Sequence, residues 1–316
     1  MARQPKGRAI DGIFLLDKSP GMSSNKALQQ IKRLYGAAKA GHTGALDPLA
    51  TGLLPICLGE ATKFSQFLLD SDKAYLTTAK LGEKTDSADA DGQVIETRPV
   101  PAVLDQATLE SLLSRHFLGE IEQVPPVYSA LKVQGQPMYK LARKGIQVEV
   151  KPRRVTVYSI RLLAIREQEL DLEIHCSKGT YIRSIVQDLG ELLGCGAHVS
   201  RLRRIKVGDF EASQMQTIEQ LEAWLQSLPE TAPEYIQNRL DALLLPAWSA
   251  IETMPSCELT PEQAIALKQG KTQVNLGLPA DSVLRAFALP DHEFLGMVET
   301  DAEGRMKGKR LIRTDQ

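Results

Sequence analysis

A segment rich in glycine and proline, residues 41–55, constrains the fold of this chain more than any other, because it fixes the backbone around a single carboxylate. Its three glycines can adopt backbone angles that are closed to other residues, and Pro48 keeps the residue before it out of the helical region. Asp47 is therefore predicted to lie on a stiff, shaped turn. No acidic residue is closer to it in sequence than Glu60, which suggests a carboxylate that acts alone.

A stiff turn is a suitable position for a catalytic nucleophile, because the reacting group must be held in one geometry. The alternative is that the Asp47-Pro48 pair only begins a turn, as most isolated Asp-Pro pairs do. The residues of this segment alone leave both interpretations open.

The composition is that of a globular protein, with 43% hydrophobic and 24% charged residues in a chain of 316. This length allows one substantial core and a smaller module. The N-terminus has no apolar stretch of signal-peptide length, and no later run approaches membrane-spanning length. We therefore expect a cytoplasmic protein.

No metal site is predicted. The four cysteines include no Cys-x-x-Cys pair, so neither a disulfide framework nor a standard zinc site is indicated. Cys195 and His198 could supply half a metal site at most. The turn at 87–92 imitates the start of a calcium loop, but Arg98 stands where that loop needs a bidentate glutamate.

The net charge of -1 conceals a strong segregation of charge. Residues 1–84 carry 12 basic and 7 acidic side chains, and residues 132–206 carry 15 and 7. Residues 207–262, in contrast, carry ten acids and one base. Two basic regions that fold together would form a cationic face for a polyanion such as nucleic acid. The alternative is lysines and arginines spread over an ordinary solvated surface.

Apolar periodicity predicts mixed elements in the first half of the chain. A helix should begin at Ser23 or Ser24, either of which can cap it, and continue to about Tyr35. The other expected elements are strands at 10–16, 74–81 and 93–97, the last two joined by a polar turn, and helices at 60–69 and 109–117.

The region 154–193 should form a β-hairpin and then an amphipathic helix. The strands are expected at 154–165 and 169–176, and the helix at 181–193 with Thr180 as its cap. Arg183 would then occupy the third position of this helix, where the helix dipole disfavours a cation. An arginine that breaks a local rule hints at an anionic partner elsewhere, although it could also point into water.

The remaining segments suggest an insertion and a terminal module. Residues 120–152, with several prolines and glycines around a possible short helix at 138–143, are predicted to leave the core. Residues 251–316 should form a small β-rich module with a helix at 261–268 and strands at 282–289 and 294–299. We therefore predict an α+β protein with a catalytic domain at 1–250, built on a central mixed, mainly antiparallel sheet, and a C-terminal domain at 251–316.

Several strings, in the right order, resemble the TruB family of tRNA pseudouridine-55 synthases, most strongly over residues 10–207. Two small departures are Ser19, where the family usually has proline, and Ser87, where it commonly has threonine. The strings are GHTGALDPLATGLLP at 41–55, LDK at 16–18 with GMSS at 21–24, GEATK at 59–63, KAY at 73–75, YSALK at 128–132 and SKGTYIR at 177–183.

The resemblance implies a pseudouridine-synthase fold with a PUA-like C-terminal domain, and isomerisation of the T-loop uridine at tRNA position 55. This reaction breaks the bond between ribose and N1 of uracil and joins the ribose to C5 of the same base. It therefore needs no oxidant, metal, ATP or other cofactor. A single carboxylate can stabilise positive charge at the sugar or form an adduct with it. The catalytic carboxylate of the family falls on Asp47, and the resemblance leaves an adduct and abstraction of a sugar proton equally open.

The resemblance also assigns roles to other residues. Arg183 would pair with Asp47, lower its pKa and keep it ionised. Tyr75 would stack on the uracil and could help to remove the C5 proton, while Tyr181 and Leu202 would line the base pocket. His42 would fill the gap that the extruded uridine leaves in the RNA. Contacts with phosphates are expected from Lys18, Lys63, Lys132, Arg201, Arg203 and Arg204, with the insertion at 120–152 closing over the RNA.

The implied partner is tRNA, bound through its T-loop and stem by a monomer without an obligate protein partner or a membrane. One rival is an RNA chaperone that refolds tRNA and whose catalysis is incidental. The other is a base-exchanging or hydrolytic enzyme that acts on the glycosidic bond, for which free uracil would be the telling product.

Overall fold

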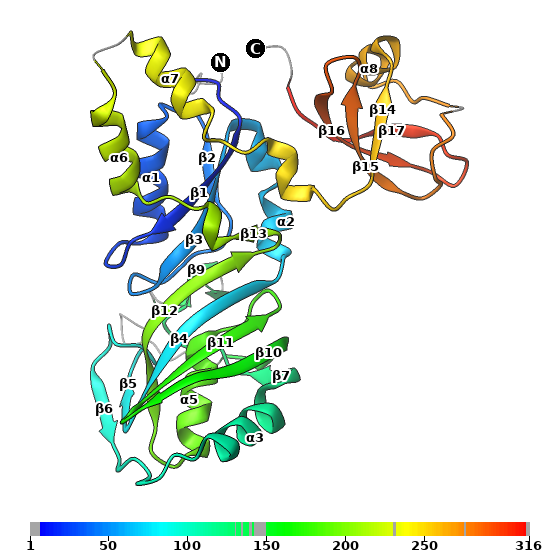
Figure 1. Ribbon diagram of the computed structural model, residues 1–316. Coiled ribbons are helices and arrows are strands. Elements are labelled where there is room, and N and C mark those ends of the chain that lie inside the picture. Colours follow the sequence, from blue (N-terminus) through cyan, green and yellow to red (C-terminus); the bar gives the residue numbers. More distant parts are fainter. Residues whose placement is uncertain are drawn as a thin grey trace.

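The computed structural model describes residues 7–129, 131–133, 135–138, 141, 150–229, 232–274 and 276–313. Nine strands within these ranges form one mixed sheet, in the order β1-β3-β12-β4-β11-β10-β7, with β2 paired to β3 and β13 paired to β12 (Figure 1). These strands are β1 (Gly12–Lys18), β2 (Ala40–His42), β3 (Thr51–Leu58), β4 (Lys73–Leu81), β7 (Gly119–Gln123), β10 (Arg153–Arg166), β11 (Glu169–Cys176), β12 (Ala197–Val207) and β13 (Phe210–Glu211). The pairs are antiparallel except β3 with β12, which confirms the predicted central sheet.

Helices α3 (Gln106–Phe117) and α5 (Ile182–Leu192) cover one face of this sheet and leave the other face open (Figure 1). Alternation along β11 shows why, because Leu170, Leu172 and Ile174 are fully buried under the helices while the residues between them are partly exposed. The predicted hairpin of β10 and β11 is confirmed, with pairing from Val157↔Cys176 to Arg166↔Glu169.

Helix α1 (Ser24–Leu34) packs beside β2 and β3 at the other end of the sheet. Ser23 caps it by accepting a hydrogen bond from the backbone N–H of Lys26, as predicted. Tyr35 follows the helix, is 1% exposed, and donates its hydroxyl to the Leu240 carbonyl at 3.1 Å. This bond ties α1 to the helical pair α6 (Ile218–Ser227) and α7 (Pro233–Asp241), which the acidic stretch forms.

The segment 41–55 is only partly a loop. It begins in β2 and ends in β3, so its irregular part is residues 43–50, named here the aspartate loop. The backbone angle φ of Gly52 is +97°, and a Cβ there would lie 2.2 Å from the Arg204 carbonyl oxygen. Only glycine therefore allows β3 to pair with β12 at this point.

One expectation for the middle of the chain needs correction. The helix expected at 60–69 is a 3₁₀ turn, η1 (Gly59–Lys63), and a short helix, α2 (Ser65–Asp70). The strand expected at 93–97 is present as β6 (Val94–Thr97), which pairs with a short strand, β5 (Glu83–Thr85). The short helix expected at 138–143 lies mostly outside the described residues. Within the insertion, β8 (Lys132–Val133) pairs with β9 (Gln136–Pro137).

A second sheet near the C-terminus confirms the predicted β-rich module. It contains β14 (Ser256–Leu259), β15 (Val283–Ala288), β16 (Glu293–Thr300) and β17 (Met306–Leu311), with helix α8 (Pro261–Lys268) beside it. The module reaches η1 through Arg310, which donates to the Lys63 carbonyl at 2.6 Å, and through a contact of Phe294 with Phe64. The 3₁₀ turns η2 (Ala212–Gln214) and η3 (Ala247–Ile251) lie before the module. The boundary at 250/251 stays a prediction.

No helix among the described residues is long and apolar enough to cross a membrane.

Candidate active site

Four side-chain contacts hold the aspartate loop in place. Ser24 accepts a hydrogen bond from the Leu46 N–H at 2.7 Å and donates to the Leu46 carbonyl at 2.9 Å. Arg204 donates to the Gly44 carbonyl at 3.2 Å, and Lys18 donates to the Pro48 carbonyl at 3.3 Å. These contacts, which come from three separate elements, agree with the predicted stiffness of this turn.

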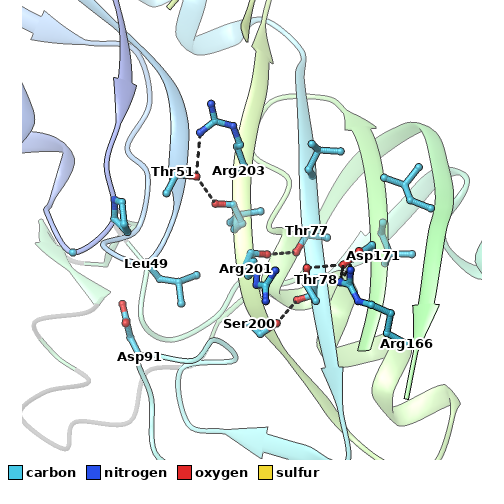
Figure 2. A pocket seen from close by; sticks show the side chains of 16 residues that line it. Leu49, Thr51, Thr77, Thr78, Asp91, Arg166, Asp171, Ser200, Arg201 and Arg203 are labelled. Atoms are coloured by element: carbon cyan, nitrogen blue, oxygen red, sulfur yellow. Dashed lines mark hydrogen bonds and ion pairs between the residues drawn. The ribbon is translucent and has the colours of Figure 1, made fainter. Parts of the chain in front are cut away.

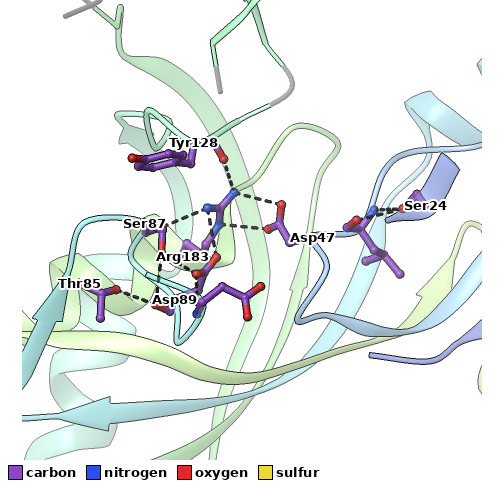
Figure 3. A network of polar contacts seen from close by, with 9 residues as sticks. Ser24, Asp47, Thr85, Ser87, Asp89, Tyr128 and Arg183 are labelled. Atoms are coloured by element: carbon purple, nitrogen blue, oxygen red, sulfur yellow. Dashed lines mark hydrogen bonds and ion pairs between the residues drawn. The ribbon is translucent and has the colours of Figure 1, made fainter. Parts of the chain in front are cut away.

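Arg183, in the first turn of α5, pairs with Asp47, as the family resemblance implied. Its Nε lies 3.1 Å from Asp47 Oδ2 and its Nη2 lies 3.2 Å from Oδ1, which is a bidentate arrangement. The same guanidinium donates to the carbonyls of Ser87 at 3.0 Å and Tyr128 at 2.8 Å (Figure 3). It is only 4% exposed, so these bonds are made away from bulk water.

Asp47 has a second carboxylate close to it in space, although none is near it in sequence. Nη1 of Arg183 also lies 3.3 Å from Oδ2 of Asp89, a side chain that is 6% exposed (Figure 3). Asp89 is fixed in turn by the hydroxyl of Ser87, which donates to its Oδ1 at 2.6 Å. Alternating aspartates in the turn at 87–92 were the available signal for this partner, but they resembled a calcium loop.

Two opposing influences set the pKa of Asp47. Burial raises it most, Arg183 lowers it, and the nearby carboxylates of Asp89 and Asp91 raise it again. The net result is a pKa above the ordinary value. Arg183 lowers the pKa as expected, but desolvation and two more acids outweigh this one guanidinium.

A cavity of about 280 Å³ lies on one side of the Asp47–Arg183 pair. Tyr75 of β4, Tyr181 and Leu202 of β12 line it together with that pair, so the structure brings these five predicted residues together. Burial raises the pKa of the Tyr75 hydroxyl, which therefore stays protonated at neutral pH. This favours stacking over proton removal for Tyr75.

His42 lines a second cavity of about 700 Å³, which Asp47 and Arg183 also line. Its Nδ1 is buried and has no hydrogen-bond partner among the described residues. Burial lowers the pKa of the imidazole, and the guanidinium of Arg204 lowers it further. A neutral ring with an unused nitrogen can still take a partner from a ligand.

The start of α5 differs from the prediction. Tyr181 is the N-cap residue, without a side-chain bond, and the hydroxyl of Thr180 instead donates to the Ser177 carbonyl at 2.9 Å. Gln123 of β7 holds the Tyr181 backbone, accepting from its N–H at 2.6 Å. Arg183 is thus the second residue of the helix, and its anionic partners explain a cation at that position.

Comparison with known proteins identifies the family. Models of the TruB family pseudouridylate synthase N-terminal domain, the tRNA pseudouridylate synthase B C-terminal domain and the pseudouridine synthase II TruB C-terminal region match residues 32–182, 183–252 and 255–312. The tRNA pseudouridine synthase B of Vibrio cholerae serotype O1 (strain M66-2) is 52% identical over 312 residues, 99% of both chains. That of Shewanella sp. (strain W3-18-1) is 54% identical over 314 residues, 99% of this chain and 97% of the other.

This chain belongs to the TruB family of pseudouridylate synthases. TruB-family enzymes are isomerases, in agreement with the predicted activity. A chain of a Cbf5-Nop10-Gar1 complex has a TM-score of 0.67 and 25% identity, covering 93% of this chain and 79% of that one. A chain of an H/ACA RNP bound to a substrate RNA containing 2'-deoxyuridine has a TM-score of 0.69 and shares the fold, at 21% identity over 100% of this chain and 92% of that one.

Two of the lysines that were expected to contact phosphate in this TruB-family chain make contacts within the protein instead. Lys18 is fully buried and donates to the carbonyls of Ser19, Met22 and Pro48, so its assignment to a phosphate is corrected. Lys63 pairs with Glu60 and donates to the Leu311 carbonyl at 2.8 Å, so its ammonium links η1 to β17. The side chain of Lys132 lies outside the described residues.

The three arginines of β12 also differ from one another. Arg204 is 2% exposed and holds the aspartate loop, and Arg203 pairs with Asp17 at 2.6 Å, so neither presents a free cation to RNA in this structure. Arg201 is exposed.

His198, which the sequence analysis considered with Cys195 as half of a metal site, has its Nδ1 3.0 Å from the Glu83 carbonyl oxygen.

Replacing Lys18 with methionine should destabilise the fold. The change leaves three inward carbonyls of the aspartate loop and the preceding turn without a donor, which costs about 2–4 kcal/mol, or a fall in Tm of about 3–6 °C. Thermal unfolding with Lys268→Met, an exposed lysine paired with Glu293, as the control would measure this. An unchanged Tm, together with weaker salt dependence of RNA binding, would restore the phosphate assignment.

Proposed function

We propose that this chain isomerises the T-loop uridine at position 55 of tRNA to pseudouridine. The name shared by relatives that match almost its whole length, tRNA pseudouridine synthase B, supports tRNA as the substrate. The observation that carries the proposal is the Asp47–Arg183 pair, which lines both a base-sized cavity and a larger one. A flipped uridine fits this arrangement, with its base in the first and the remaining loop in the second.

Asp47 is the group that acts on the ribose. The bond between C1′ and N1 of uracil breaks, the base turns, a bond forms between C1′ and C5, and the C5 proton leaves. The carboxylate either forms an adduct with the sugar or removes a sugar proton, and both routes begin from the ionised form. Arg183 is a positioning residue, since its bidentate contact fixes the direction in which the carboxylate points.

The walls of the small cavity hold the detached uracil. Tyr75 stacks on the ring, and Tyr181 and Leu202 close the pocket so that water cannot hydrolyse the activated sugar. His42 occupies the place in the RNA that the flipped base leaves, where its unused Nδ1 gains a partner.

The remaining contacts are with the RNA as a whole. The insertion at 120–152 closes over the T-loop and stem, Lys132 contacts a phosphate, and the β-rich module at 251–316 acts as a PUA-like RNA-binding domain. We place this activity in the cytoplasm and in a monomer. No cofactor or metal takes part in the proposed reaction.

The test uses a T-arm hairpin RNA, or full tRNA, labelled with tritium at C5 of uridine. Isomerisation releases the label into water and leaves pseudouridine in the strand without free uracil. Free uracil that keeps its label, without release of tritium into water, would instead indicate a hydrolase or base exchanger. Accelerated tRNA refolding without any release would indicate a chaperone.

A further inference from the structure

Two walls of the small cavity are held in place in different ways. Tyr75 and Leu202 belong to β4 and β12, which pair with each other along most of their length. A side chain adds a further link between these strands, because the Thr77 hydroxyl donates to the Arg201 carbonyl at 2.9 Å (Figure 2). The sheet itself therefore fixes this wall.

The wall that contains Tyr181 lies outside the sheet. Tyr181 is placed between the loop at 177–180 and helix α5, and it belongs to neither a strand nor the helix. Its hydroxyl forms a hydrogen bond with the side chain of Ser129. Its backbone is held by a side chain from a different element, β7.

Gln123, the last residue of β7, contacts both backbone polar groups of Tyr181. Its Oε1 accepts from the Tyr181 N–H at 2.6 Å, and its Nε2 donates to the Tyr181 carbonyl at 3.3 Å. Two facing residues of antiparallel strands exchange the same pair of bonds. The amide therefore substitutes for a neighbouring strand, and these two bonds together are named the backbone clamp.

Gln123 is buried at a position where the strand pattern calls for an apolar side chain. Ile121, two residues earlier on the same face of β7, packs against the hydrophobic core. Gln123 is only 3% exposed, and a buried amide is costly unless its oxygen and its nitrogen both find partners. One residue of the base pocket supplies both partners, so the burial of the amide and the position of Tyr181 depend on each other.

The backbone clamp also lies beside the pair of arginine and aspartate. Arg183 follows Tyr181 by two residues, in the first turn of α5. Next to the clamp, the Val124 carbonyl accepts from the Ser184 hydroxyl at 2.7 Å. Movement of Tyr181 away from β7 would therefore displace the start of α5 and, with it, the guanidinium that orients the carboxylate.

We propose that Gln123 is a positioning residue for the isomerisation, which holds Tyr181 against the uracil through the backbone clamp. The assignment rests on the proposed function, because Tyr181 has this role only if the small cavity takes a uracil. Gln123 does not line that cavity. Its loss should therefore slow the chemical step and leave the binding of RNA almost unchanged.

Gln123→Leu removes the clamp with a side chain of similar size that forms no hydrogen bond. The single-turnover rate of tritium release at saturating T-arm hairpin should fall by about 10–100-fold, because a misplacement of about 1 Å in an active site causes losses of this size. The Kd of the hairpin should stay within about threefold. A rate within about threefold of wild type, or a loss confined to Kd, would overturn the proposal.

Gln273→Leu is the matched control. Gln273 is also buried, at 9% exposed, and its Nε2 donates to the Gln263 carbonyl at 2.8 Å, but it lies in the β-rich module. Its loss should leave the rate within about twofold of wild type. Thermal unfolding of both variants establishes that each is folded at the assay temperature, and equal losses of rate in the two folded variants would mean that the effect is general and that the clamp has no special role.

Gln123→Glu gives a second test that depends on the hydrogen bonds and not on the size of the side chain. A protonated carboxyl has one donor and one acceptor in the shape of the amide, whereas the ionised form has lost the donor. The ratio of its rate to the wild-type rate should therefore rise by at least about fivefold from pH 8 to about pH 5, since burial raises the pKa of the introduced carboxyl into this range. Dividing by the wild-type rate removes the acid limb that both enzymes share through Asp47.

Gln273→Glu is the control for this pH dependence, and its ratio should stay near one throughout. A ratio for Gln123→Glu that does not change with pH would overturn the backbone clamp. Wild-type enzyme that releases no tritium from the hairpin would overturn the proposed function itself, whereas equal release by wild type and Gln123→Leu would overturn only the role of Gln123.

Discussion

Replacing Asp47 with asparagine should lower the rate of pseudouridine formation by at least about 10⁴-fold. Asparagine keeps the shape of the side chain but cannot stabilise positive charge at C1′ or accept a proton from the sugar. RNA affinity should stay within about threefold, because binding depends on cations and stacking elsewhere in the cleft.

Tritium release in single-turnover conditions measures the first effect, and equilibrium binding of the T-arm hairpin measures the second. Asp209→Asn is the control, since Asp209 is an exposed aspartate in the turn between β12 and β13, away from the Asp47–Arg183 pair. A variant at Asp47 that accumulated pseudouridine at the wild-type rate would exclude this carboxylate from the chemistry.

The raised pKa of Asp47 adds two pH effects. Because the ionised form reacts, the acid limb of the rate profile should lie above the ordinary aspartate pKa of 3.8. A carboxyl with a raised folded-state pKa contributes stability that is fully present below the unfolded value and is lost as pH rises through the folded value.

The Asp47→Asn variant should therefore be no less stable than wild type at pH 7, with any gain disappearing as the pH falls towards 3.8. The gain is small, because 37% of the side chain is exposed and water screens the charge. Thermal unfolding at several pH values checks the sign. A variant that is less stable at pH 7 would mean that the pair with Arg183 contributes more than burial costs.

Apolar periodicity was sufficient for elements that bury one clear face. Helix α5 and the hairpin of β10 and β11 are examples, since their buried residues recur at 3.6 and 2 positions. Strand β12 was not predicted, because the consecutive arginines Arg203 and Arg204 interrupt the alternation of apolar and polar residues that is typical of a strand. Their guanidiniums are satisfied by Asp17 and by backbone carbonyls of the aspartate loop, partners that are distant in sequence.

The active site was predictable only in part, because some partners of its residues are distant in sequence. Arg183 could be matched with Asp47 because it breaks a rule of its own helix, and the family resemblance supplied the partner. The only local signal for Asp89 was the alternating aspartates at 87–92, which resembled a calcium loop, and nothing local indicated that the Tyr128 carbonyl shares the guanidinium. Lys18 was assigned to phosphate from the resemblance, whereas here the side chain is buried and its ammonium donates to backbone carbonyls around a turn.

Replacing Arg183 with lysine should have the second-largest effect, a fall in kcat/KM of about 10²–10³-fold. The charge is retained, but a single ammonium cannot reach both oxygens of Asp47, the carboxylate of Asp89 and two carbonyls at once. Most of the loss should appear in kcat, since the arginine orients the carboxylate that acts on the sugar.

Two further readouts separate positioning from a merely structural role. With Arg183 replaced, the acid limb of the rate profile should move to higher pH, because the guanidinium is what lowers the pKa of Asp47 against burial. Stability should fall by about 2–4 kcal/mol, since buried acceptors lose donors. Arg161→Lys, which changes a surface pair with Glu173, is the matched control. The opposite outcome would be an Arg183→Lys variant whose kcat stays within about threefold of wild type and whose acid limb does not move. That result would mean that Asp47 is oriented by its loop alone.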